Sequence, residues 1–501
     1  MFHEAAARIL RSAAGLGMSF IAVVCAASAV AGGSDGWQDG TALTGGLSTV
    51  LPPPNNGKYI TEGPPGNVHV VWKDDRDRNF EIYHRVRSGG VWGQARRVTF
   101  DGAPSARPVV ASDAIGKVHL VWNDSRDGNK EIYHSMWDGY GWSGPHRVTF
   151  TGGDSFAPSS VATGYTLHIV YSEMTAGFFE IYYVNLDFAE WSEPLRLTAG
   201  ATGDRLVPTI AAGPDGTVHV AWWDLGEGGS AGGSIYHMEG PGDWSGARLV
   251  SGPEADAMRP SVAVDDSGRV HVAWIDKRDG WEQIRLRTRG RDGIWGEEAL
   301  LTSGDFTHYH PSLSMAGDEL VLLYWADNPS ISNSGCFVRR LAGGVWGGPV
   351  RISGGDSNSS LTCLYGKEDG TLYAGWVDGM GSVSAIYFNE YIPPGTGVGE
   401  DDEPEGELPP AALSVSVHPN PFDGETEIGI ELPGNTEVTA DLYDVSGRRV
   451  RRLCRRAMEG GGNAIRWDGR DGAGRAVSPG IYMLRVRAGK LSAVRKVVHW
   501  R

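Results

Sequence analysis

The sequence of 501 residues is short of cysteine, of basic residues and of long apolar runs. Only 4 Cys are present, so a disulfide scaffold is excluded, and a Cys336–Cys363 bridge is the one pairing left open. The 45 Lys and Arg against 61 Asp and Glu give a net charge of −16, which argues against a nucleic-acid partner. Beyond residue 31 no stretch is apolar enough to span a bilayer. At roughly 100–200 residues per domain, the length predicts two to four domains.

The N-terminus has the pattern of a targeting segment. Arg8 and Arg11 precede a small, apolar stretch at 12–31 that ends in Ala-Val-Ala, a small-x-small cleavage site. We therefore expect residues 1–31 to be a signal peptide, with export to the extracellular space or outer surface of a bacterium and no membrane span after cleavage. Two alternatives are a retained anchor, for which the run is marginal, and a lipoprotein at Cys25, which the preceding valine disfavours.

What the sequence has in abundance is glycine and aromatic residues, with 72 Gly, 18 Trp and 17 Tyr, a composition typical of short strands and tight turns. A phrase of the type Val-His-Val-Ala-Trp recurs about every 50 residues, at 68–72, 118–122, 167–171, 218–222, 270–274, 320–324 and 372–376. A fixed period of this length indicates a solenoid or a propeller. Period-2 alternation around the phrase predicts four short strands per copy, which is the size of a propeller blade.

The last strand of each copy begins at a tryptophan, and the positions are Trp92, Trp142, Trp191, Trp244, Trp295 and Trp346. The seventh copy lacks this residue, but Trp37 precedes the first copy in a matching phrase. We therefore expect an all-β, seven-bladed propeller over 32–391, whose N-terminal strand completes the last blade and leaves no open sheet edge. The alternative is that 32–50 is an unstructured leader and that the seventh blade has three strands.

A linker and a second domain follow. Residues 392–412 are rich in Pro, Gly and acids, which predicts an extended tether. Residues 413–501 are basic and return to alternating strands, which predicts a small antiparallel sandwich.

Three phrases of this second domain carry a resemblance, and they are Pro419-Asn-Pro-Phe422, Leu442-Tyr-Asp-Val-Ser-Gly447 and the stretch from Trp467-Asp-Gly through Gly480-Ile-Tyr482. They resemble the immunoglobulin-like module of flagellar hook-cap proteins and, equally, the C-terminal sorting domain of type IX secretion cargo. The resemblance implies a non-catalytic sorting or attachment domain, whose partner is the secretion or surface-attachment machinery.

Charged residues gather in the loops that one face of the propeller would carry. Three loops after the repeated phrase share an Asp-x-Arg-Asp motif, and its residues are Asp74, Arg76, Asp77, Asp124, Arg126, Asp127, Asp276, Arg278 and Asp279. The loops that lead into the next blades add Arg107, Arg205, Arg259, Tyr309 and His310. Guanidinium groups and aromatic rings suit carboxylate-bearing or polyhydroxylated ligands. The alternative is a turn device, in which Asp caps the turn and Arg pairs with it.

The histidines of the repeated phrase are expected to be structural, since they alternate with core residues, one per blade, at His69, His119, His168, His219 and His271. No metal site or cofactor is predicted; the acidic loops could take Ca²⁺, but their spacing matches no EF-hand.

Two turns, at Asp138–Trp142 and Asp292–Trp295, resemble degraded Asp-boxes of sialidase-like BNR propellers. Membership in that family would imply six blades, three arginines on a sugar carboxylate, a Tyr–Glu nucleophile pair, an acid Asp and a Phe/Tyr-Arg-Ile-Pro phrase, which is absent here. The sequence therefore predicts a non-catalytic propeller that binds a glycan or another cell-surface polymer. The alternatives are a sialidase-like glycoside hydrolase acting on acidic sugars and a protein–protein scaffold.

Overall fold

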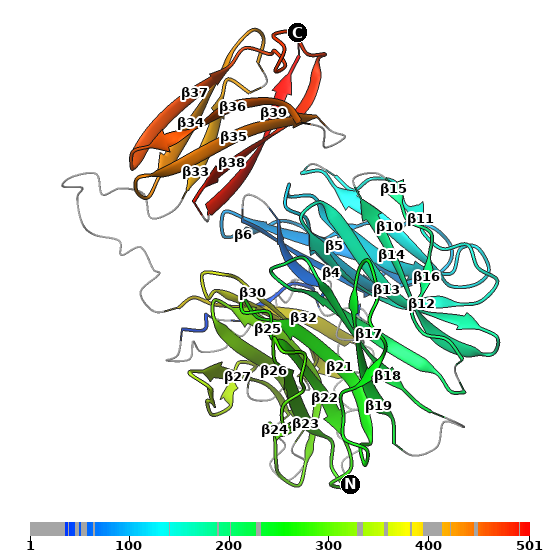
Figure 1. Ribbon diagram of the computed structural model, residues 1–501. Helices are drawn as coiled ribbons and strands as arrows, with labels where there is room; N and C mark the ends of the chain where they lie inside the picture. Colours follow the sequence, from blue (N-terminus) through cyan, green and yellow to red (C-terminus); the bar gives the residue numbers. More distant parts are fainter. Residues whose placement is uncertain are drawn as a thin grey trace, which may run out of the picture.

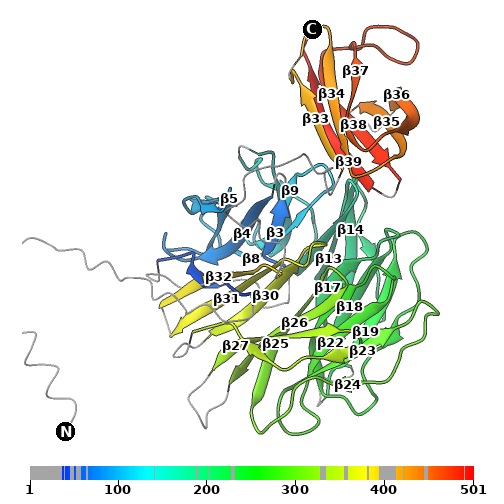
Figure 2. The same ribbon diagram turned by 90° about the vertical axis from the view of Figure 1, so that its left-hand side faces the viewer.

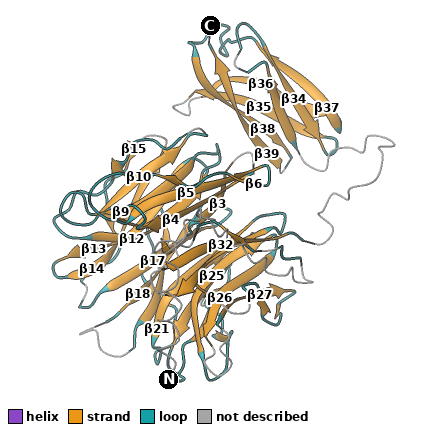
Figure 3. Ribbon diagram, turned by 180° about the vertical axis from the view of Figure 1, so that it is seen from behind, coloured by secondary structure: helices purple, strands orange, loops and turns teal. Residues whose placement is uncertain are grey.

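The computed structural model describes residues 36–38, 40–45, 50–51, 58–63, 66–139, 141–187, 190–200, 202–226, 232–327, 334–354, 359–380, 383–393, 413–420, 422–444, 449–489 and 491–500. Every regular element in these ranges is a β-strand (Figure 3). No helix of sufficient length and apolarity to cross a membrane occurs in them. The expected signal peptide and nearly all of the expected linker lie outside the described residues.

Residues 41–391 form seven antiparallel sheets that follow one another along the chain. The first sheet comprises β2 (Val50–Leu51), β3 (Ile60–Gly63), β4 (Asn67–Asp74), β5 (Glu81–Ser88), β6 (Val91–Trp92) and β7 (Arg96–Arg97). The second comprises β8 (Ser105–Ser112), β9 (Val118–Asp124), β10 (Glu131–Trp137) and β11 (His146–Arg147). The third comprises β12 (Ser155–Thr163), β13 (Thr166–Thr175), β14 (Phe178–Asp187), β15 (Glu190–Trp191) and β16 (Leu195–Arg196).

The remaining four sheets repeat the same plan. The fourth comprises β17 (Arg205–Ala212), β18 (Val218–Asp224), β19 (Ser234–Gly240) and β20 (Arg248–Leu249). The fifth comprises β21 (Ala257–Val264), β22 (Val270–Asp276), β23 (Gln283–Arg289) and β24 (Ala299–Leu300). The sixth comprises β25 (Thr307–Ala316), β26 (Glu319–Asp327), β27 (Gly335–Ala342), β28 (Val345–Trp346) and β29 (Val350–Arg351). The seventh comprises β30 (Ser359–Gly366), β31 (Leu372–Met380), β32 (Val383–Tyr391) and, from the N-terminus, β1 (Thr41–Ala42).

The N-terminal strand pairs with the seventh sheet, as the Trp37 phrase predicts. Thr41 lies opposite Phe388, Ala42 lies opposite Tyr387, and Trp37 bridges to Tyr391. The Leu43 amide donates to the carbonyl of Ile386 at 2.7 Å, and the Leu43 side chain is buried. The alternative of an unstructured leader is therefore wrong for residues 40–45.

The first strands of neighbouring sheets lie side by side. Strand β8 contacts β12, β12 contacts β17, β17 contacts β21, β21 contacts β25, and β25 contacts β30. Strand β3 contacts both β8 and β30 (Figures 1 and 2). The first strands of the seven sheets therefore line a shared interior.

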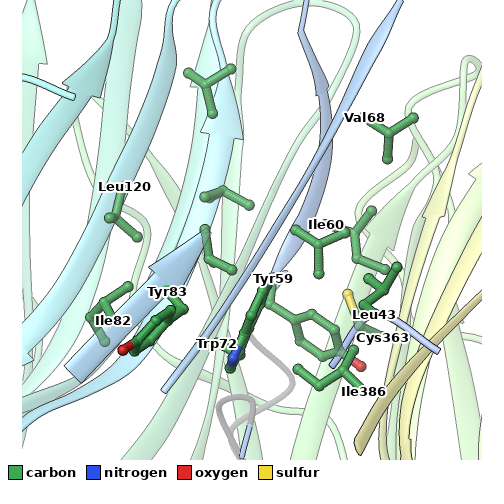
Figure 4. Packing of buried hydrophobic residues seen from close by; sticks show 14 of the residues in the cluster. Leu43, Tyr59, Ile60, Val68, Trp72, Ile82, Tyr83, Leu120, Cys363 and Ile386 are labelled. Atoms are coloured by element: carbon green, nitrogen blue, oxygen red, sulfur yellow. The ribbon is translucent and has the colours of Figure 1, made fainter. Parts of the chain in front are cut away.

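The repeated phrase forms the second strand of each sheet and is buried. In β22 every residue is buried, because neighbouring sheets cover both of its faces. Its tryptophans are among the largest fully buried side chains, and they are Trp72, Trp122, Trp222, Trp274 and Trp376. Figure 4 shows how Leu43 and Ile386 of the seventh sheet meet Tyr59 and Ile60 of the first.

Cys336 and Cys363 are both buried and form no disulfide with each other, so the bridge left open by the sequence is absent. Each thiol packs in a hydrophobic cluster of its own, Cys363 with the first sheet and Cys336 with the sixth and seventh.

The C-terminal residues form two sheets around one hydrophobic cluster, as expected for a small sandwich. The sheets comprise β33 (Ser414–His418), β34 (Thr426–Leu432) and β37 (Gly461–Trp467), and β35 (Thr436–Asp444), β36 (Arg449–Met458), β38 (Gly480–Ala488) and β39 (Leu491–His499). Trp467 is fully buried at their centre, with its ring 5.2 Å from Phe422 and 5.1 Å from Tyr482.

Candidate functional site

Six of the first strands contain a β-bulge at the same place in the repeat. The pairing of β8 with β9 shifts between Ala106 and Val109, and the other five strands shift at the matching residues. In each bulge one residue adopts a positive φ of 50–54°, and these residues are Arg107, Ala157, Val207, Arg259, His310 and Leu361. A bulge takes one residue out of the alternating pattern and re-aims its side chain. The conformation is uncommon for residues other than glycine, and it recurs here around the shared interior.

Three of these residues interact, and Arg107 of the second sheet is far in sequence from Arg259 and His310 of the consecutive fifth and sixth sheets. Arg259 Nη1 donates a hydrogen bond to His310 Nδ1 at 3.2 Å. Burial and the Arg259 charge lower the pKa of His310 to about 3, so the imidazole is neutral. Burial and the same Arg259 charge lower the pKa of Arg107 to about 10. Two guanidinium groups thus repel each other in a half-buried setting.

A lysine adds to the positive charge. Burial together with the Arg107 charge lowers the pKa of Lys73. Aromatic rings support the cations, since Lys73 Nζ lies 4.3 Å from the Phe80 ring centroid and the Arg107 guanidinium lies 5.1 Å from that of Phe156. Arg107 forms no ion pair within the part of the chain that the structure describes. We call Lys73, Arg107, Arg259 and His310 the basic cluster.

A tyrosine–glutamate pair stands beside this cluster. Tyr309 Oη donates to Glu282 Oε1 at 3.0 Å, and Lys277 Nζ lies 2.7 Å from the same oxygen. Burial alone would raise the pKa of Glu282, but hydrogen bonds from Lys277, Thr307 and Tyr309 lower it. Burial and the Glu282 bond raise the pKa of Tyr309. The Tyr309 ring stacks on Trp325 with centroids 5.3 Å apart, which fixes its orientation.

Glu282 was not among the residues singled out from the sequence. It directly precedes β23, at the position that Phe80, Lys130 and Phe179 occupy in the first three sheets. In the sequence, Glu282 is marked only by being acidic at a position where the first three sheets have Phe or Lys. Its contact with Tyr309 arises where the fifth and sixth sheets meet, which the sequence does not display.

The arginines of the Asp-x-Arg-Asp loops are engaged inside their own sheets. Arg126 Nη2 lies 2.7 Å from Asp124 Oδ2, Arg278 Nη2 lies 2.5 Å from Asp276 Oδ2, and Arg76 pairs with Asp74 in the same way. The first aspartate of each motif is completely or almost completely buried. This is the arrangement that the turn-device alternative describes.

The other acids of the motif, and Arg205, also have partners close by. Asp77 lies 3.1 Å from Arg97, Asp127 lies 3.2 Å from Arg147, and Asp279 pairs with Arg285. Arg205 lies 2.6 Å from Glu180 and 2.8 Å from Asp224. Of the expected ligand-binding residues, the structure therefore brings together Arg107, Arg259, Tyr309 and His310, and places the others in ion pairs.

The histidines of the repeated phrase pair with a residue on the neighbouring strand. The partners are His84 for His69, His134 for His119, Tyr183 for His168, His237 for His219 and Thr288 for His271, at 2.7–3.1 Å. All five are buried, so they cross-link the second and third strands. Within the described ranges, no group of three or more His, Cys, Asp or Glu side chains is arranged to hold a metal ion.

Comparison with known proteins gives a separate match for each of the two parts of the chain. Residues 416–492 match the FlgD Ig-like domain. A PL25 ulvan lyase, solved bound to -[GlcA(1-4)Rha3S]-, superposes with a TM-score of 0.53 at 10% identity, over 69% of this chain and 94% of that chain.

Two further solved structures are more distant. The polysaccharide lyase Uly1 gives a TM-score of 0.43 at 11% identity, over 67% of this chain and 89% of that chain. The Trypanosoma rangeli sialidase gives a TM-score of 0.40 at 12% identity, over 82% of this chain and 86% of that chain. No curated protein matches the sequence. The chain is thus similar in fold to the ulvan lyase, with an all-β architecture of antiparallel sheets, and its residues 416–492 match an FlgD Ig-like domain.

Proposed function

We propose that residues 32–391 form a closed, seven-bladed propeller that binds an acidic glycan at the basic cluster, and that residues 413–501 sort or attach the exported protein. The contacts of β3 with both β8 and β30, and the pairing of β1 with β32, support closure of the ring. On this proposal, 392–412 is a tether between the two domains.

The observation that carries the proposal is the bulge that presents Arg107, Arg259 and His310 at the same place in three sheets, where Arg259 donates to His310 and its charge lowers the pKa of Arg107. The mutual repulsion of the two arginines in a half-buried site costs free energy that an anionic group between them would recover. Guanidinium groups bind carboxylate and sulfate with charge-assisted, often bidentate hydrogen bonds. The neighbouring Phe156 and Phe80 rings offer surfaces on which sugar rings can stack. A polymer such as the glucuronate- and sulfate-bearing chain held by the lyase of similar fold presents both features.

The test is calorimetric titration of the full chain with a sulfated, glucuronate-containing oligosaccharide. Arg259→Ala should weaken binding about 10- to 100-fold, the range for losing hydrogen bonds to a charged group. Val207→Ala is the matched control, because Val207 holds the same bulge position in the fourth sheet without a charge. Equal affinities for wild type and Arg259→Ala would contradict the proposal.

Catalysis on the same ligand is the second candidate, favoured by the Tyr309–Glu282 hydrogen bond of 3.0 Å beside Arg259. Sialidase-like enzymes need such a pair. Product release from acidic oligosaccharides, abolished in Tyr309→Phe and Glu282→Gln while binding persists, would establish an enzyme. Binding without product release would leave the protein a non-catalytic glycan binder.

The role proposed for the C-terminal domain is tested by location. A chain truncated after residue 412 should be recovered from the culture medium or the periplasm, whereas the full chain should be found with the outer cell surface. The same distribution for both chains would remove the attachment role and leave the glycan proposal untouched.

A further inference from the structure

A pocket of about 250 Å³ is lined by residues of β25, β26 and β27 of the sixth sheet and of the chain segment that precedes β25. Figure 1 labels these three strands. Its wall is largely aromatic. The lining residues include Phe306, His308, Tyr324, Ala326, Phe337 and Arg339. The volume is slightly below the usual range for drug-sized ligands, about 300–1,000 Å³, and fits one small ring.

The pocket exists because the repeat is broken at one place. Six second strands carry an acidic residue two positions after the aromatic residue that ends the repeated phrase, whereas the sixth carries Ala326 there. The six acids are Asp74, Asp124, Glu173, Asp224, Asp276 and Asp378. In the second sheet, Ser105 Oγ donates to Asp124 at 2.8 Å, and the Arg126 guanidinium that binds Asp124 lies 4.6 Å from the Tyr133 ring centroid. The sixth sheet has no carboxylate at this position.

The residue opposite the missing acid is left with an unmet polar atom. His308 pairs in register with Ala326, as Ser105 does with Asp124. The His308 side chain is only 3% exposed, and its Nδ1 makes no hydrogen bond of standard geometry among the described residues, although the backbone carbonyls of Glu282 and Phe306 act on its pKa. A buried polar atom without a well-placed partner is unfavourable. A ligand hydroxyl in the pocket would satisfy it.

The pocket offers aromatic faces and a single charged group, Arg339. The Phe306 ring centroid lies 4.7 Å from that of His308, and the Tyr324 centroid lies 5.9 Å from that of Phe337. Arg339 is held in place by hydrogen bonds to the carbonyls of Leu301 and Gly347. Burial lowers the pKa of His308 to about 4, so the imidazole is neutral at neutral pH. The pocket therefore presents mainly apolar ring surface, in contrast to the several cations of the basic cluster.

We propose that this pocket is a second binding site that takes one neutral pyranose ring, stacked on Phe306, Tyr324 and Phe337 and hydrogen-bonded through a hydroxyl to His308 Nδ1. The site does not depend on the proposed function, because it shares none of the residues of the basic cluster. An extended polysaccharide with alternating acidic and neutral units could use both sites.

The experiment is saturation-transfer NMR on the full chain with a panel of neutral sugars (glucose, galactose, rhamnose, xylose and N-acetylglucosamine) and with glucuronate for comparison. At least one neutral sugar should receive saturation, chiefly at the C–H protons that face the aromatic rings. Ala326→Leu should weaken this binding at least about tenfold because the side chain fills the pocket. Val345→Ala, a change at an exposed position of the same sheet, should leave it unchanged.

If Ala326→Leu fails to fold, His308→Ser decides the question. It restores the residue found at Ser105 and should weaken binding about 3- to 10-fold, the value of one neutral hydrogen bond. Saturation transfer to none of the neutral sugars, or equal transfer to wild type and to a folded pocket variant, would overturn the proposal.

Discussion

Arg126 and Arg107 lie in the same sheet and show two opposite uses of one side chain. Burial disfavours the charge of Arg126, but the hydrogen bonds and charge of Asp124 raise its pKa overall. Arg107 has burial and the Arg259 charge acting together, and both lower its pKa. The first arginine belongs to a motif that recurs and stabilises its sheet. The second occupies a position whose residue changes from sheet to sheet, and it is left with a charge that a ligand can meet.

The largest expected effect comes from removing a whole repeated element. Deleting residues 32–50 takes away β1 with the buried side chains of Trp37 and Leu43. Loss of one buried Leu or Trp side chain costs about 2–5 kcal/mol, so the free energy of unfolding should fall by roughly 5 kcal/mol or more. Urea denaturation would measure it. An unchanged midpoint would mean that the seventh sheet does not need its N-terminal strand.

Asp124→Ala breaks the recurring pair directly. The carboxylate is fully buried and accepts hydrogen bonds from Ser105, Trp122 and Arg126. Removing one partner of a buried ion pair costs about 3–5 kcal/mol, which denaturation should show, while binding at the basic cluster should persist. A loss below about 1 kcal/mol would mean that this pair contributes no more to the free energy of unfolding than a solvent-exposed ion pair does.

The recurring histidines should make stability depend on pH. Burial lowers the pKa of His69 and of His168 to about 4, below the value near 6.5 of an unfolded chain. Between these two values the unfolded state binds more protons, so stability falls as the pH drops from 7 towards 4. Each histidine should contribute about 1–2 kcal/mol between pH 7 and 5. Denaturation at both pH values should show a smaller difference for His168→Gln than for wild type.

The smallest effect should have the opposite sign. Arg107→Met keeps the length of the side chain and its packing on Phe156 but removes the charge that Arg259 repels. The free energy of unfolding should therefore rise by about 1 kcal/mol, while affinity for an acidic oligosaccharide falls. Destabilisation by this variant would show that Arg107 is structural, like Arg126, and would erase the contrast between them.

Much of the architecture could be predicted because it is written in local patterns. The alternation around the repeated phrase identified the second strands, and the absence of a seventh tryptophan identified Trp37 as the partner of the last sheet. The basic cluster and the Tyr309–Glu282 pair beside it could be predicted only in part. The sequence singles out Arg107, Arg259, Tyr309 and His310 because their loops share one face, but it does not single out Lys73 and Glu282. Their roles depend on side chains of other sheets, as with Tyr309 and Glu282, and on bulges that only paired strands reveal.

The positive-φ bulge has a consequence for how such a protein can change over time. Its backbone is nearly the same in six sheets, yet it presents Arg, Ala, Val, Arg, His and Leu in turn. The conformation therefore does not depend on which side chain it carries. Each position can be exchanged singly, without rebuilding the strands around it, so a new ligand preference can arise by point substitution. Substitution at these six positions therefore changes the side chains that the first strands present while the backbone that carries them stays the same.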